Sequence, residues 1–205
     1  EKAISICVGK KGIGTQEVTV QILGDSFVNG AFFRDALLSK NYIPGIKLVG
    51  LRNIKNEEGQ YDEGRGGWTV KKYFEIPKGE MTSYHGYMQP VGEYRYWGSC
   101  EFWKNCYKVI NGELTDTEIV YDCGRYDQCI TKFDKETGYL AAPKKNDLMY
   151  DNARGSYMVY TGKKWKHVEI DERKWAFNYR KYLDMWNLDA PKFFAQMLGL
   201  NDYRD

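Results

Sequence analysis

The stretch "QILGDSFVNG", residues 21–30, decides how this chain is expected to fold. It completes an apolar run over residues 18–23 that is rich in β-formers and predicts a buried strand. The run stops at Gly24, and the following "GAFFRDALLSK" has apolar residues at helical spacing. We therefore expect a strand to turn sharply into a helix at Asp25 and Ser26.

This turn has two interpretations. The hydroxyl of Ser26 is expected at the carboxyl end of a strand and near a helix N-terminus, where backbone N–H groups are free and negative charge is favoured. A nucleophile that must stabilise an oxyanion needs those surroundings. Alternatively, Asp25 and Ser26 only cap the helix, because both residue types are common N-caps.

Two other segments predict strands of the same sheet. The segment "NYIPGIKLVGLRN" has a turn signal at Pro44 and Gly45 and predicts a strand over 46–51, so the chain begins as strand, helix, strand. The segment "KFFAQMLGLND" predicts a strand over 193–198 that is apolar on both faces, as in the interior of a parallel sheet. Before it, "DERKWAFNYRKYLDMWNL" predicts a helix with one aromatic face from Trp175 to Trp186.

The middle of the chain has a different character. Tyrosine, tryptophan, glycine and short alternating runs dominate from about residue 75 to 170, which predicts a β-rich and loop-rich insertion with a hairpin turn at "GKKW". Its rings have polar neighbours and suit the apolar faces of sugars, or they form the core of a small β subdomain. Both interpretations are compatible with an insertion that shapes a substrate cleft.

Composition excludes several classes of protein. The 205 residues carry a net charge of +2 without a basic block, so we expect no nucleic-acid partner. No apolar stretch approaches the ~20 residues that cross a bilayer, so we expect no membrane span.

The five cysteines leave their redox state open. Cys100 and Cys106 have the same spacing as Cys123 and Cys129, and Cys7 makes the total odd. Disulfides are compatible with export, and buried free thiols are the alternative. A zinc site is disfavoured because the spacing is longer than in zinc knuckles.

Three short motifs are expected to meet at one edge of the sheet. "GDS" (24–26) ends the first strand, "GGWT" (66–69) lies in a loop, and "GLND" (199–202) ends the last strand. Carboxyl ends of parallel strands share one rim, where α/β folds place their sites. The amide groups of Ser26 and Gly67 and the side-chain NH2 of Asn201 could then bind one oxyanion.

In these motifs the chain resembles the SGNH hydrolase family, also called GDSL esterases. "GDSF" resembles the first block of the family, "GRGGWT" the second and "GLND" the third. The resemblance implies a flavodoxin-like three-layer α/β fold with a parallel sheet, in which the strand over 46–51 flanks the first strand on one side and that over 193–198 flanks it on the other. It divides the chain into core (1–75), insertion (76–170) and continuation of the core (171–205).

The resemblance also implies roles for individual residues. Ser26 is the nucleophile, with Gly67 and Asn201 in the oxyanion hole and Asp25, Gly66 and Asp202 in support, Gly66 being the alternative to Gly67. Ser26 and Asn201 should then lie within ~8 Å of each other, since both touch one reacting group. No cofactor or metal is called for.

The chain departs from the family at its fourth block. An Asp-x-x-His signature near the C-terminus is absent, and neither His85 nor His167 has an aspartate three residues before it. We therefore expect a C-terminally incomplete unit whose sheet is completed by further residues or a second chain, and no histidine partner for Ser26 in this chain. The alternative is that His85 or His167 serves as the base.

The resemblance implies a serine esterase that removes acetyl or similar acyl groups, with a small acyl ester or an acylated carbohydrate as substrate. "EGRGGWT" and "FFAQMLGLND" resemble secreted bacterial members that act on carbohydrate esters, which implies an extracellular or periplasmic location. A lipase or thioesterase is an alternative and would need an apolar cleft. A non-catalytic carbohydrate-binding protein on a hydrolase scaffold is the alternative outside enzymes.

Overall fold

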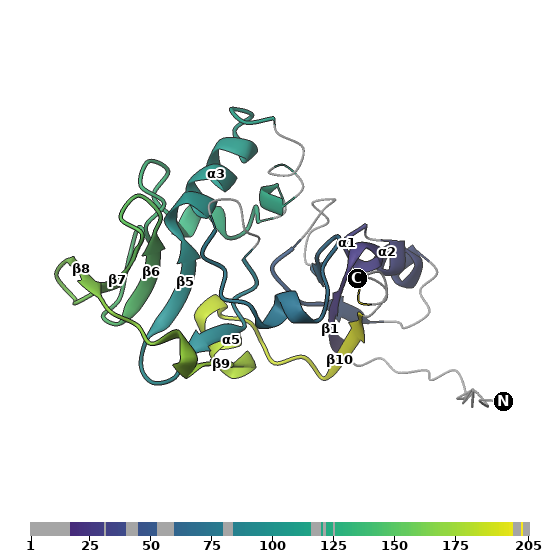
Figure 1. The fold of residues 1–205 in the computed structure, drawn as a ribbon. Helices are drawn as coiled ribbons and strands as arrows, with labels where there is room; N and C mark the ends of the chain where they lie inside the picture. Colours follow the sequence, from purple (N-terminus) through teal and green to yellow (C-terminus); the bar gives the residue numbers. More distant parts are fainter. Residues whose placement is uncertain are drawn as a thin grey trace.

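A computed structural model of the chain describes residues 17–30, 32–39, 45–52, 60–79, 84–115, 120, 122–124, 126–198 and 202. Together they form a mixed α/β structure with three separate sheets (Figure 1). Cys7 lies outside the described residues.

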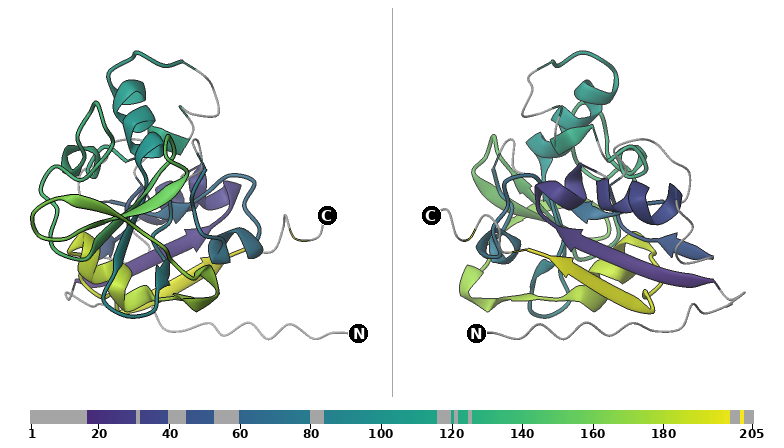
Figure 2. Two further views of the ribbon diagram at one scale, coloured as in Figure 1. Left: turned by 60° about the vertical axis from the view of Figure 1, so that its left-hand side comes forward. Right: turned by 90° about the vertical axis from the view of Figure 1, so that its right-hand side faces the viewer.

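The first sheet is parallel and has the predicted strand order. Strand β1 is central and pairs with β10 on one side and with β2 and the short β3 on the other. Figure 2 shows β1 and β10 side by side, although almost the whole chain separates them in sequence. No described strand of the insertion pairs with β1, as predicted. The bounds are β1 (Val18–Gly24), β2 (Ile46–Leu48), β3 (Glu63–Gly64) and β10 (Phe193–Met197).

The two faces of this sheet have different neighbours. Ile22 of β1 packs with Leu48 of β2 and with Val28 of helix α1 (Ser26–Asn29), and Leu37 of helix α2 (Phe32–Ser39) joins the edge of this cluster. The opposite face carries Leu23, which belongs to the aromatic core shared with the insertion. The predicted strand-to-helix turn is therefore present and is packed on one face of the sheet.

Strand β10 is an edge of the described sheet, in contrast to the interior position that its sequence suggests. It pairs only with β1 among the described strands, and Phe193 and Phe194 are 61% and 48% exposed. The apolar side chains of β10 are therefore largely exposed, and the strand is not buried on both faces as its sequence predicts. Exposed apolar edges of this kind favour pairing with another strand.

The insertion contains a four-stranded sheet in the order β5-β6-β7-β8. The predicted "GKKW" hairpin is confirmed, since β7 and β8 pair antiparallel across a turn with Gly162 at a φ of +92°. Helix α3 (Cys100–Ile110) was not predicted; it begins after Ser99, whose hydroxyl accepts the N–H of Phe102 as an N-cap. The strands are β5 (Arg95–Ser99), β6 (Asp147–Asp151), β7 (Ser156–Tyr160) and β8 (Trp165–Val168), with the 3₁₀ turn η2 (Ile130–Lys132) before β6.

The long helix predicted over 171–188 is wrong in its first half. The chain forms η3 (Glu172–Lys174) and then β9 (Trp175–Phe177), which pairs with β4 (Met88–Pro90) of the insertion. Helix α5 (Tyr179–Trp186) begins only after Asn178, whose side chain accepts the N–H of Lys181. The N-cap at Asn178 fixes the start of the helix, although the helical apolar pattern begins earlier in the sequence. The residues before Asn178 pair with β4 instead and form a strand.

The four described cysteines, Cys100, Cys106, Cys123 and Cys129, are buried free thiols. Burial raises the pKa of Cys100 to about 12 and raises that of Cys106 and Cys129, so these thiols are protonated at neutral pH. They pack as small apolar side chains. Among the described residues, no helix combines the length and the apolar composition needed to span a membrane.

Candidate functional site

The turn after β1 exposes Ser26 at the start of helix α1. Asp25 is the N-cap: its buried carboxylate accepts the N–H of Phe27 at 3.1 Å. The side chain of Ser26 is exposed and makes no hydrogen bond to the rest of the described chain. Of the two interpretations of this turn, the capping role falls to Asp25, and the hydroxyl of Ser26 is left free for another use.

Close packing holds this turn in place. A Cβ on Gly24 would lie 2.4 Å from Cγ2 of Val28 and 2.8 Å from the carbonyl oxygen of Met197. The N–H of Asp25 donates to that same carbonyl at 3.3 Å. The end of β1, the start of α1 and the end of β10 are therefore joined at the carboxyl rim of the sheet.

The glycine loop of the second motif lies at the same rim. The N–H of Arg65 donates to the carbonyl of Gly24 at 2.8 Å, and the N–H of Trp68 closes a turn onto the carbonyl of Arg65 at 3.3 Å. Gly66 and Gly67 form the middle of this turn, and Gly67 is exposed with a φ of +71°. A side chain would strain that backbone conformation, which explains a glycine at this position.

The third motif reaches this loop through Asp202. Its carboxylate oxygens accept the N–H of Val70 at 3.0 and 3.2 Å, at the N-terminus of the 3₁₀ helix η1 (Lys71–Phe74). Asn201 lies outside the described residues, so the expected distance of ~8 Å between Asn201 and Ser26 stays a prediction. The structure thus joins the first motif to the second and the second to the third.

Neither histidine contacts Ser26. His85 is buried; its Nε2 lies 3.0 Å from the carbonyl of Glu75, and its Nδ1 accepts the N–H of Tyr87 at 3.1 Å. His167 is exposed on β8, which Figure 1 places at the opposite end of the molecule from α1. The described geometry therefore agrees with the expectation that this chain supplies no histidine base to Ser26.

We expect His85 to make the protein less stable in acid. Burial, followed by the charge of Arg65, lowers the pKa of His85 from 6.5 to about 3. The unfolded chain binds a proton as the pH falls below about 6.5 and the folded chain does not, so the free energy of unfolding falls by at most about 1.4 kcal/mol per pH unit. The measurement is urea unfolding of wild type and His85→Gln between pH 7 and 4.5.

The variant is expected to lose this part of the pH slope, while His167→Gln on exposed β8 should keep it. A His85→Gln protein with the full wild-type slope would show that His85 is protonated in the folded state.

A buried ion pair directly precedes the glycine loop in the chain, and the sequence did not predict it. Glu63 and Arg65 are both fully buried, and Nη1 of Arg65 lies 3.0 Å from Oε2 of Glu63. Oε1 of Glu63 accepts the N–H of Leu51 at 2.7 Å and the hydroxyl of Tyr182. These contacts connect β3, the segment that follows β2 and helix α5.

Arg65 extends this network into the insertion. Nη2 of Arg65 donates to the carbonyl of Tyr84 at 2.8 Å and to the hydroxyl of Tyr126 at 3.2 Å. Its guanidinium also lies 5.2 Å from the ring centre of Trp68 and 5.6 Å from that of Tyr73. The side chain of Arg65 therefore holds the insertion while its backbone holds the glycine loop against β1.

Most rings of the insertion form its core. Trp103 is fully buried and stacks on Phe133 at 4.0 Å, and Trp97 of β5 is buried in the same cluster. Tyr96 of β5 is buried in a second cluster with Tyr157. This outcome supports the aromatic-core interpretation over a surface platform for sugars. No described group of His, Cys, Asp and Glu side chains is arranged to hold a metal ion.

Comparison with known proteins adds no further information. No family model, no curated protein and no solved structure matches this chain. The interpretation of the site therefore depends on its own geometry and on the motifs in the sequence.

Proposed function

We propose that the protein is a serine ester hydrolase of the SGNH type, with a flavodoxin-like core and Ser26 as its nucleophile. The observation that carries this proposal is the exposed Ser26 at the first position of α1, with the glycine loop bonded to Gly24 beside it. The N–H groups of Ser26 and Gly67 donate to no acceptor among the described residues. They are therefore available to an oxyanion, with Asn201 as the third donor.

The reaction proceeds through an acyl-enzyme. Oγ of Ser26 bonds to the ester carbonyl carbon as its proton passes to a base, and the oxyanion accepts hydrogen bonds from the donors named above. The bond to the alcohol then breaks, and the same proton passes to the leaving oxygen. Water repeats the attack and releases the carboxylic acid. Because His85 is bonded to backbone and His167 lies at the far end of the molecule, the base is a histidine from outside these 205 residues.

The free edge of the described parallel sheet at β10 also needs a partner. We infer that further residues of the protein or a second chain pair with β10, since β10 pairs only with β1 among the described strands and leaves an unpaired edge. An acylated carbohydrate as substrate and an extracellular or periplasmic location remain proposals that come from the resemblance alone.

A non-catalytic carbohydrate-binding protein is the second candidate. It is favoured by one observation: neither described histidine contacts Ser26. Such a protein would keep the fold and the rim, and its Ser26 would have ordinary reactivity.

Covalent labelling separates the two candidates. An alkyl fluorophosphonate forms a Ser–O–P bond and releases fluoride only at an activated serine, so an adduct is expected on the peptide that contains Ser26. Mass spectrometry locates the adduct; Ser156, half-buried on β7, is the internal control and should stay unmodified. A folded, full-length protein that takes up no label at Ser26 would be the binding protein and not the enzyme.

A further inference from the structure

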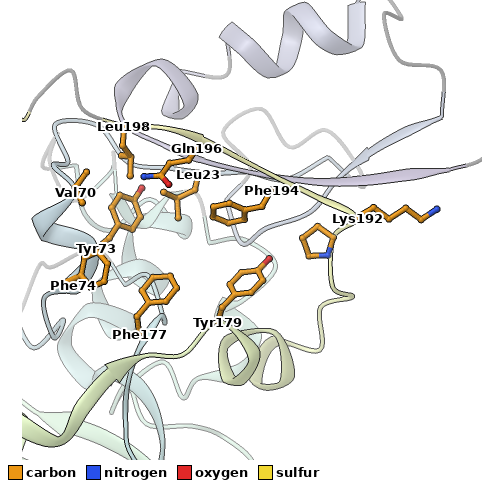
Figure 3. Close-up of a pocket in the computed structure, with 11 residues that line it drawn as sticks. Leu23, Val70, Tyr73, Phe74, Phe177, Tyr179, Lys192, Phe194, Gln196 and Leu198 are labelled. Atoms are coloured by element: carbon orange, nitrogen blue, oxygen red, sulfur yellow. The ribbon is translucent and has the colours of Figure 1, made fainter. Parts of the chain in front are cut away.

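An apolar cavity of about 540 Å³ lies between the parallel sheet and the elements that follow the glycine loop (Figure 3). Its floor is the face of β1 and β10 that carries Leu23, Phe194 and Leu198, and its walls include Phe74 of η1 and Phe177 of β9. Cavities of about 300–1,000 Å³ are typical of small-molecule sites.

Three phenylalanine side chains that line the cavity are exposed to solvent. Phe74, Phe194 and Phe177 are 56%, 48% and 40% exposed. They are grouped: the rings of Phe74 and Phe177 lie 5.4 Å apart, and Tyr179 meets Phe194 edge to face at 5.7 Å. Grouped exposed apolar side chains of this kind mark a binding site more often than isolated ones do.

The cavity adjoins all three motifs of the rim. Leu23 lies three residues before Ser26, and Leu198 lies three residues before Asn201. Val70 lies three residues after Gly67 and is held by the carboxylate of Asp202. Each chain segment that supplies a member of the proposed oxyanion hole therefore also supplies a wall of the cavity.

The polar groups of the lining do not favour a charged ligand. Lys192 is its only charged lining residue among those described, and Nζ of Lys192 donates to the carbonyl of Glu17 at 3.0 Å. Figure 3 shows the Lys192 side chain directed away from the aromatic rings. The hydroxyl of Tyr179 is buried without a hydrogen-bond partner, so it adds no charge to the lining.

We propose that this cavity binds the apolar acyl group of the substrate, and that the preferred substrates are esters of medium-chain or aromatic acids rather than acetyl esters. The assignment rests on the proposed function, because it takes the rim at Ser26 as the place of reaction. An acyl chain that enters between Leu23, Val70 and Leu198 would place its carbonyl at that rim and its apolar end among the rings of Phe74, Phe177 and Phe194.

Two measurements test this inference, one of which needs no catalysis. Isothermal titration of the Ser26→Ala protein with octanamide should detect binding at least about tenfold tighter than with acetamide, because six more methylene groups leave water. Phe194→Ala in that background should weaken octanamide binding about tenfold. Phe193→Ala is the matched control on the same strand; its side chain points to the opposite face and should leave binding unchanged.

The second measurement compares hydrolysis of 4-nitrophenyl octanoate and acetate by the full-length protein. We expect kcat/KM to favour octanoate by about tenfold or more, and Phe194→Ala to reduce that ratio while Phe193→Ala preserves it. Hydrolysis at Ser26 without chain-length preference would overturn the cavity assignment and leave the proposed function intact. Octanamide binding without ester hydrolysis would support the cavity assignment and overturn the proposed function. Absence of octanamide binding, or a dimer in sedimentation that Phe194→Ala dissociates, would reject the cavity as an acyl site.

Discussion

Replacing Ser26 with alanine is expected to reduce ester hydrolysis to background, a loss of roughly 10⁴-fold or more in kcat. Replacing Asn201 with alanine is expected to lower kcat by roughly 10²–10³, because one oxyanion donor contributes about 3–4 kcal/mol to the transition state. The measurement is steady-state hydrolysis of a 4-nitrophenyl ester by the full-length protein and both variants. The two expected losses differ because the proposed mechanism gives the covalent bond to Ser26, whereas Asn201 would share the oxyanion with two backbone donors.

The control for Asn201→Ala is a second asparagine, Asn111, whose side chain is exposed. Asn111 follows α3, and its side-chain NH2 donates to the carbonyl of Tyr107 at 2.9 Å. Asn111→Ala should leave kcat unchanged, and thermal unfolding of both variants should stay close to wild type. If kcat of Asn201→Ala equals that of wild type, the oxyanion role of Asn201 is wrong, even if Ser26 is the nucleophile.

The parallel sheet was predictable because its signals are local and strong. The apolar run that ends at Gly24 and the apolar run of β10 each specify a strand, and the helix between the first two strands requires a parallel crossover. The position of Ser26 follows from the same signals, since a serine directly after such a strand lies at the rim. The hairpin at "GKKW" was predictable for the same reason: a short turn between two alternating runs.

Other parts of the fold depend on partners that are distant in sequence. Trp175 fits a helical pattern with Tyr179 and Tyr182, yet it pairs with Pro90 in a sheet formed with the insertion. Apolar periodicity cannot separate these outcomes, because tertiary pairing overrides local propensity. The N-cap signal at Asn178 was the one local feature that could have placed the start of α5 correctly.

The buried ion pair was missed for a related reason. Glu63 and Arg65 flank Gly64 in a glycine-rich stretch that is typical of an exposed loop, where charged side chains are common. The structure instead inserts this stretch beside β1, where a Cβ on Gly64 would lie 2.2 Å from the amide nitrogen of Asn29. Glu63 and Arg65 carry opposite charges and flank Gly64, which lies against another backbone segment. This arrangement was the one signal in the sequence for a buried ion pair.

Replacing Glu63 with glutamine is expected to lower the free energy of unfolding by about 3–5 kcal/mol. Glutamine keeps the shape and can still accept the N–H of Leu51, but it removes the charge that compensates Arg65 in a fully buried position. Arg65 would then be a buried cation whose described acceptors are neutral, among them the carbonyl of Tyr84, the hydroxyl of Tyr126 and the carbonyl of residue 63. Urea unfolding measures the loss, which is a large fraction of the ~5–15 kcal/mol typical of a folded domain.

An exposed ion pair of the same chain supplies the control. Glu172 pairs with Lys78 at 2.7 Å, with side chains 41% and 35% exposed, and Glu172→Gln should cost no more than about 1 kcal/mol. The double variant Glu63→Gln, Arg65→Met removes both charges and should be less destabilised than the sum of the two single variants, since neither partner is left buried alone. If Glu63→Gln costs as little as Glu172→Gln, the pair at Glu63 and Arg65 does not hold the glycine loop to the insertion. If the cost is as large as expected, the same network that holds the insertion also fixes the loop at Gly67, because the backbone N–H of Arg65 is bonded to Gly24 at the end of β1.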